Sequence, residues 1–202
     1  MKSKIYTVTI YEDGEFYWKL NGKLHREDGP AVKYADGSEL YYRNDKLHRE
    51  DGPAVKCPDG REFYHFNGII HREDGPAIKH PDGAEYYYFN GKYHREDGPA
   101  VKWADGSEIY YLNGKYHRED GPAVKYSNGN EAYYINGELH REDGPAVKWA
   151  DGKEEYWLNN KRYSKDDFDK EILKRKNKVK KSLACENKHV IVDGIKYKLT
   201  KV

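Results

Sequence analysis

The sequence of 202 residues contains almost no cysteine: only Cys57 and Cys185, in unlike contexts, with no CxxC motif and no cluster of cysteine and histidine. Two isolated cysteines argue against a disulfide framework and against a zinc site, so we expect both thiols to be free. The chain also has almost no net charge, because 36 lysines and arginines stand against 35 aspartates and glutamates. This balance gives the chain as a whole no electrostatic preference for one class of partner.

Long apolar runs are missing as well. No stretch approaches the ~18 consecutive apolar residues of a membrane span, and the N-terminal MKSKIYTVTIYEDGE lacks the apolar core and small-residue cleavage site of a secretory signal. We therefore expect a cytoplasmic protein without a membrane span. The 35% of charged residues would suggest disorder, but disordered chains are poor in aromatics, and this one has 20 tyrosines and 4 tryptophans. A folded chain is expected.

What the sequence has in abundance is repetition. The letters HREDGPA occur six times, each copy 23 residues after the last, and a constant period of this kind indicates a repeat architecture. The histidines of the motif are His25, His48, His71, His94, His117 and His140. An Asp-Gly or Asn-Gly column from Asp13 to Asp151 and an asparagine column from Asn21 to Asn159 extend the count to seven units, of which the first and last are imperfect.

Three turn signals divide each unit into short runs rich in strand-forming residues. In the unit at 31–53 they are Asp36-Gly37, Asn44-Asp45 and Asp51-Gly52-Pro53. Helical periodicity is absent before about residue 164. The pattern predicts an all-β, antiparallel β-meander over residues 1–163, with two strands per unit and growth along one axis.

Aromatic residues form columns through the units. The fourth position after the hairpin glycine is nearly always tyrosine, which we interpret as a structural contact between neighbouring hairpins. The fifth position points to the other face, because side chains alternate along a strand, and it varies more between units. Tyrosine combines a large rigid contact area with a hydrogen-bonding tip, so we expect a partner-binding face in this column. Its residues are Tyr88, Tyr111, Tyr134 and Trp157.

The repeated HREDGPA motif contains the residue types of catalysis. Histidine beside carboxylates suits acid–base chemistry, and His25 with Glu27 would begin a metal site. An active site, however, needs one asymmetric constellation rather than six equal copies. We therefore predict a structural role, with Gly29 supplying a positive φ and Pro30 fixing the exit from the turn, and no catalytic residue, metal or cofactor. Repeated small-ligand binding in equivalent clefts between units is the alternative.

The letters YLNGKYH at 111–117 and WADGS at 103–107 resemble the MORN repeat family, over roughly residues 6–163. The resemblance implies an elongated single-layer sheet of hairpins that docks partner proteins or self-associates, and lipid binding is often proposed for that family. The repeat style is also similar to that of proteins encoded by phages and large DNA viruses. It implies a viral protein that acts in the host cytoplasm by binding and inhibiting a host protein.

After Tyr163 the period ends, and residues 164–202 form a second unit. Ser164 and Asp167 resemble a helix capping box, and an apolar stripe of Phe168, Ile172 and Leu173 is expected to cover the open edge of the last hairpin. The segment VIVDGIKYKL at 190–199 predicts a terminal hairpin around Asp193-Gly194.

The same tail carries a basic cluster that offers possible anion binding. Its members are Lys174, Arg175, Lys176, Lys178, Lys180 and Lys181. Contact with phosphate backbones is one interpretation, but a solvated helix end is favoured. Taken together, the sequence predicts a non-enzymatic, protein-binding repeat scaffold. The alternatives are a nucleotide or carbohydrate binder, nucleic-acid contact through the tail, and self-association.

Overall fold

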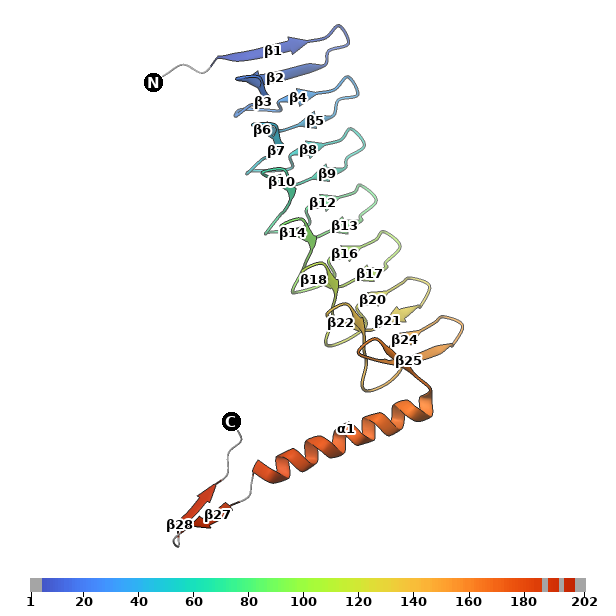
Figure 1. Cartoon of the computed structure of the whole chain (residues 1–202). Helices are drawn as coiled ribbons and strands as arrows, with labels where there is room; N and C mark the ends of the chain where they lie inside the picture. The colour runs from blue at the N-terminus through green and yellow to red at the C-terminus, as the bar shows by residue number, and fades with distance from the viewer. Residues whose placement is uncertain (1–4, 187–188, 193–194, 199–202) are drawn as a thin grey trace.

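The computed structural model describes residues 5–186, 189–192 and 195–198, with side chains described from 5 to 179. The repeats form a long stack of short strands, followed by one helix that leaves the last unit (Figure 1). Sixteen strands pair in one antiparallel sheet, which confirms the predicted meander. Along the chain they are β1 (Tyr6–Ile10), β2 (Phe16–Leu20), β3 (Lys23–Leu24), β4 (Val32–Lys33), β5 (Glu39–Leu40), β8 (Val55–Lys56), β9 (Glu62–Phe63), β12 (Ile78–Lys79), β13 (Glu85–Tyr86), β16 (Val101–Lys102), β17 (Glu108–Ile109), β20 (Val124–Lys125), β21 (Glu131–Ala132), β24 (Val147–Lys148), β25 (Glu154–Leu158) and β26 (Lys161–Tyr163).

The interior strands of this sheet contain two residues each, one apolar and one charged. In the register Val101 lies opposite Ile109, and Lys102 lies opposite Glu108. The same alternation continues into the next unit, where Glu108 meets Lys125. Lysine and glutamate face each other in this way from β4 to β25, and cross-strand pairs of opposite charge stabilise such a ladder.

A second row of hairpins branches from the main sheet, one in each interior unit, and these form separate two-stranded sheets. They are β6 (Tyr42–Arg43) with β7 (Lys46–Leu47), β10 (His65–Phe66) with β11 (Ile69–Ile70), β14 (Tyr88–Phe89) with β15 (Lys92–Tyr93), β18 (Tyr111–Leu112) with β19 (Lys115–Tyr116), and β22 (Tyr134–Ile135) with β23 (Glu138–Leu139). Each interior unit thus has four short strands, where the sequence predicted two.

The expected long strand is divided in two at the fourth residue after the hairpin glycine, which is Tyr41 in the unit at 31–53. The N–H of Tyr41 donates to the carbonyl of Ala54 in the next unit, while its own carbonyl accepts from the N–H of His48. Tyr41 is therefore a corner where the chain leaves the main sheet. The hairpin that follows turns through Asn44 and Asp45, which both adopt positive φ, 52° and 64°. Asparagine and aspartate tolerate this region better than most residues.

The two rows are bonded from unit to unit. In the second row the N–H of Asp45 donates to the carbonyl of Leu24 at 2.9 Å, and the N–H of Gly68 donates to that of Leu47 at 2.8 Å. The alanine that ends each HREDGPA motif is fully buried at the junction between units. These alanines are Ala31, Ala54, Ala77, Ala100, Ala123 and Ala146. Each unit therefore contacts its neighbours along two backbone rows, as a quasi-one-dimensional array does.

The C-terminal helix α1 (Lys165–Glu186) begins at the predicted capping box. The hydroxyl of Ser164 accepts from the N–H of Asp167 at 3.2 Å, and Phe168 is 4% exposed with its ring 5.1 Å from that of Tyr156. The predicted apolar stripe is wrong for Leu173, which is 60% exposed. At 100° per residue, position 173 lies about 140° around the helix from 168, away from the array.

Beyond the helix, β27 (His189–Val192) pairs with β28 (Ile195–Lys198), and His189 lies opposite Lys198. The predicted turn residues Asp193 and Gly194 lie outside the described residues. Within the described part of the chain, α1 is too polar to cross a membrane.

Candidate functional site

The HREDGP loops form one face of the array, and their arginines are tied into it. Arg95 stacks on the ring of Tyr87 at 4.0 Å, and its Nε donates to Asp97 Oδ1 at 2.8 Å. The hydrogen bond from Arg95 holds the pKa of the Asp97 carboxyl below its usual value. The stacking is repeated in the other units, with Arg26 over Trp18, Arg49 over Tyr41, Arg72 over Tyr64, Arg118 over Tyr110 and Arg141 over Tyr133.

This stacking also places the guanidinium of each loop close to the glycine of the motif. The sequence predicted a positive φ at Gly29, which is wrong, since the positive-φ glycines include none of the HREDGP loops. A Cβ at Gly29 would instead lie 2.9 Å from Arg26 Cζ, and one at Gly98 would lie 3.0 Å from Arg95 Cζ. A side chain at this position would displace the guanidinium that folds back over the glycine.

The histidine of each motif holds the turn of the following unit. His94 Nδ1 accepts a hydrogen bond at 3.2 Å from the N–H of Asn113, a residue with positive φ. Accepting at Nδ1 places the proton of the neutral ring on Nε2, which lies 3.8 Å from Glu96 Oε1. Equivalent bonds join His48 to Asn67, His71 to Asn90, His117 to Asn136 and His140 to Asn159. The imidazole therefore has a structural contact in these units.

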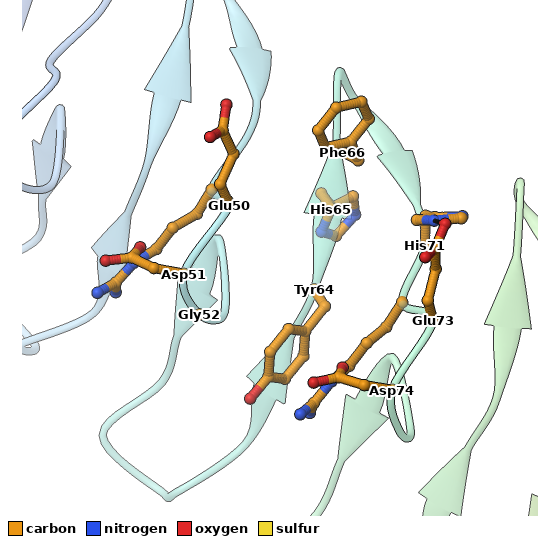
Figure 2. A pocket seen from close by; sticks show the side chains of 11 residues that line it. Glu50, Asp51, Gly52, Tyr64, His65, Phe66, His71, Glu73 and Asp74 are labelled. Carbon is orange, nitrogen blue, oxygen red and sulfur yellow. Dashed lines mark hydrogen bonds and ion pairs between the residues drawn. The ribbon is translucent and has the colours of Figure 1, made fainter.

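Shallow clefts separate successive HREDGP loops. Figure 2 shows one of about 560 Å³, with Glu50 and Asp51 on one side, His71 and Glu73 on the other, and Tyr64 between them. Two further clefts of about 470 and 700 Å³ lie between other loops. Tyr64, His65 and Phe66 all line this cleft, although strand alternation predicted His65 on the other face. Among the described residues no group of three or more histidine, cysteine, aspartate or glutamate side chains is arranged to hold a metal ion.

The predicted partner-binding tyrosines lie in the second row of hairpins, where Tyr111 and Tyr134 pack against apolar residues of the main sheet. Tyr88, Tyr111 and Tyr134 lie in one row, and Tyr93 and Tyr116 lie between them. Successive ring centroids in this tyrosine row are 4.2, 4.9, 4.6 and 4.9 Å apart. Burial raises the pKa of Tyr88 and Tyr111 well above the usual value.

The sequence interpretation missed the two interleaved rings. Tyr93 and Tyr116 occupy a position after the Asn-Gly turn where other units have leucine or isoleucine, such as Leu47 and Leu139. The signal was the change from leucine to tyrosine in two adjacent units. The row ends at Tyr134, because the residue that would supply the next ring is Leu139, which is not aromatic.

Trp157 lies outside the tyrosine row. It lies on β25, where its Nε1 donates to Glu155 Oε2 at 3.1 Å, and it faces Arg162 of β26 across the ladder. Among the described residues no ring contact joins Trp157 to Tyr134. Three of the four predicted residues are therefore clustered, and the fourth lies at the end of the array.

A further aromatic column, at the base of the main-sheet turns, lies on the same side as the tyrosine row. Trp103 packs with the tyrosines against Val101, Ile109 and Val124. Its ring is nearly parallel to that of Tyr126, with centroids 6.2 Å apart and an angle of 10°. Tyr126 and Trp149 are exposed. We call the tyrosine row together with Trp103, Tyr126 and Trp149 the aromatic face.

The basic cluster of the tail does not form one free surface. Arg175 Nη1 contacts Glu142 Oε1 of the last HREDGP loop at 3.0 Å, and its Nε contacts Glu171 at 3.4 Å. Lys174 lies 3.9 Å from the same Glu171. Lys176 and Lys178 are exposed, and the side chains of Lys180 and Lys181 lie outside the described ones. Cys57 is a free thiol, as predicted, and the side chain of Cys185 is likewise outside the described part.

The chain matches no protein-family model. A comparison with curated protein sequences likewise gives no match.

Proposed function

We propose that this chain is a non-enzymatic repeat scaffold that binds a protein partner through its aromatic face. The observation that carries the proposal is the tyrosine row, five rings in successive contact across three units that pack beside the apolar residues of the main sheet. Tyrosine and tryptophan are enriched at the centres of protein interfaces, because they bury much area while losing few side-chain rotamers.

The rigidity of the array supports the same conclusion. Each unit is hydrogen-bonded to the next through the main sheet and through the second row of hairpins. The arginine and histidine of each loop are engaged in internal contacts, such as Arg95 with Tyr87 and His94 with Asn113. An aromatic surface held on such a frame loses little conformational entropy when a partner docks.

The test is affinity capture with two matched variants. Tyr88→Leu combined with Tyr111→Leu alters the aromatic face while keeping apolar volume, whereas Glu96→Ala combined with Glu119→Ala alters only exposed side chains of the loops. A partner captured by the wild type and by the loop variant, but lost by the face variant, supports the proposal. Equal capture by all three would place the interface elsewhere. Thermal unfolding of each variant checks that the fold is intact.

The clefts between HREDGP loops favour a second candidate, a binder of small polar ligands such as nucleotides or carbohydrates. Three clefts have equivalent linings of arginine, glutamate, aspartate and tyrosine. Calorimetry separates the two functions by stoichiometry. One protein partner per chain favours the scaffold, while several identical small ligands per chain favour the clefts.

We also propose that the chain is related to the MORN repeats, that it is a viral protein, and that it acts in the cytoplasm. The repeated hairpins agree with the architecture that this resemblance implies.

A further inference from the structure

One hollow on the aromatic face is unlike the others. It has a volume of about 300 Å³, and its aromatic lining consists of Tyr116, Tyr126, Tyr134 and Trp149. The main sheet contributes Val124, Ala132 and Val147, which lie directly opposite one another in the register of β20, β21 and β24. The hollow therefore has an apolar floor and rings around it.

The hollow exists because of one residue. Ala132 occupies a position that Leu40, Phe63, Tyr86 and Ile109 fill in the four preceding interior units. In the adjacent unit Ile109 is buried and packs between Val101 and Val124. Alanine removes most of that side chain while the aromatic neighbours remain, so the space is left open.

The lining of the hollow contains no lysine or arginine, and its two acids are Glu131 and Glu155. Glu155 lies opposite Val147 in the register and so shares the face of Ala132, whereas the side chain of Glu131 points to the other face, where it lies 3.9 Å from Lys148. Glu155 lies 3.6 Å from Lys153 and 3.5 Å from Arg162, and it accepts a hydrogen bond from Trp157 Nε1. The hollow therefore contains one ion-paired carboxylate, and its attraction for a cation comes from the aromatic rings.

The four aromatic rings of the hollow favour one kind of group. The π-faces of tryptophan and tyrosine attract a cation, and aromatic cages of this composition recognise quaternary ammonium groups. A bare ammonium is strongly hydrated and would lose that water against the valines, whereas a trimethylammonium presents apolar methyl groups. A neutral aliphatic group of the same shape would lack this attraction to the π-faces.

We propose that the hollow over Ala132 binds a trimethylammonium group, carried as a trimethylated lysine on the partner protein. This inference rests on the proposed function for the source of the group, because the hollow adjoins Tyr134 at the end of the tyrosine row and a bound polypeptide would contact both.

The test is calorimetry of the intact chain with four probes. They are the peptide acetyl-Gly-Gly-trimethyllysine-Gly-Gly-amide, the same peptide with unmodified lysine, the same peptide with a neutral tert-butyl group in place of trimethylammonium, and choline. We expect the trimethylated peptide to bind at least about tenfold more tightly than the unmodified and neutral peptides. Equal binding of the neutral peptide, or no binding of the trimethylated one, would overturn the proposal. Choline binding as tightly as the peptide would overturn the assignment to a partner's side chain.

Variants locate the site. Ala132→Ile restores the residue type of the preceding unit, fills the hollow and should abolish peptide binding, while Ala132→Ser keeps the hollow and should retain it. Binding that survives Ala132→Ile with an unchanged unfolding temperature refutes this site. These measurements need no partner, so they are independent of the capture experiment. Loss of capture by the Tyr88 and Tyr111 variant tests the scaffold, and loss of peptide binding by Ala132→Ile tests the hollow.

Discussion

The two ends of the array differ in whether the outermost strands are covered by other residues. Five-residue strands occur in the main sheet only near its two ends, as β1 and β2 at one end and β25 at the other. At the C-terminal end β26 folds back on β25, Phe168 of the helix is buried against Tyr156, and Arg175 contacts Glu142. At the N-terminal end β1 pairs with β2 alone among the described strands.

The open edge of β1 follows from the ladder. The N–H of Tyr11 donates to the carbonyl of Glu15, so the alternation of antiparallel bonds turns Thr9 and Thr7 toward β2. The N–H and C=O groups of Tyr6, Val8 and Ile10 then face outward. The strand YTVTI contains no charge and no proline, and Ile10 is 73% exposed. Edges of this kind are templates for pairing with another strand.

The repeat provides hydrogen-bond partners for both edges of a strand only in the interior of the array. Every interior strand has a neighbour on both sides, and each end needs residues that depart from the repeat. The C-terminal end has such residues, whereas no described strand pairs with the outer edge of β1, which is therefore suited to self-association.

Truncation after Tyr163 should have the largest effect. Without α1 the ring of Tyr156 and the last strands lose their cover, and we expect oligomers or aggregates in size-exclusion chromatography with light scattering. An in-frame deletion of residues 71–93 is the control, and it should leave a shorter, soluble protein, because the two joined units present the same bonding rows. A soluble monomeric truncation would show that the helix is not a cap.

Phe168→Ala tests the same end with one side chain. Removing a buried phenylalanine should lower the free energy of unfolding by about 3 kcal/mol. Leu173→Ala on the exposed side of the helix is the matched control and should change it by less than about 0.5 kcal/mol. Thermal or urea unfolding measures both. Similar losses for the two variants would contradict the buried contact.

Val8→Pro tests the open end. Proline removes an outward N–H at the centre of β1 and is tolerated at sheet edges, so the bonds between β1 and β2 should remain. If copies of the chain pair through β1, the dissociation constant from sedimentation equilibrium should rise about tenfold, as for a loss of about 1.4 kcal/mol. Self-association unchanged by this substitution would exclude the β1 edge.

His94→Ala supplies the interior reference and should have the smallest effect. It leaves the N–H of Asn113 without its partner, which should cost about 1 kcal/mol in unfolding free energy. The association state should not change, since both edges of the unit stay paired. Loss of partner capture by this variant with an intact fold would contradict the structural role of the histidine.

Much of the architecture was predictable because turn chemistry is local. Asp36-Gly37 and Asn44-Asp45 indicated two of the turns in a unit, and the 23-residue period indicated the array. The corner at Tyr41 was missed, because a continuous aromatic run looks like one strand until the bonds to Ala54 and His48 divide it. The role of Gly29 was misjudged for a similar reason, since only the folded loop brings the guanidinium of Arg26 over it.

At the site, two features were readable from the sequence: which aromatic columns vary between units, and that Tyr88, Tyr111 and Tyr134 share a face. The second follows because alternation along a strand depends only on position. Only the tertiary structure decided that Tyr93 and Tyr116 lie between them, and that Ala132 leaves a hollow among four rings. Those contacts join residues of different strands and units. They depend on how the second row of hairpins folds against the main sheet, which no local pattern specifies.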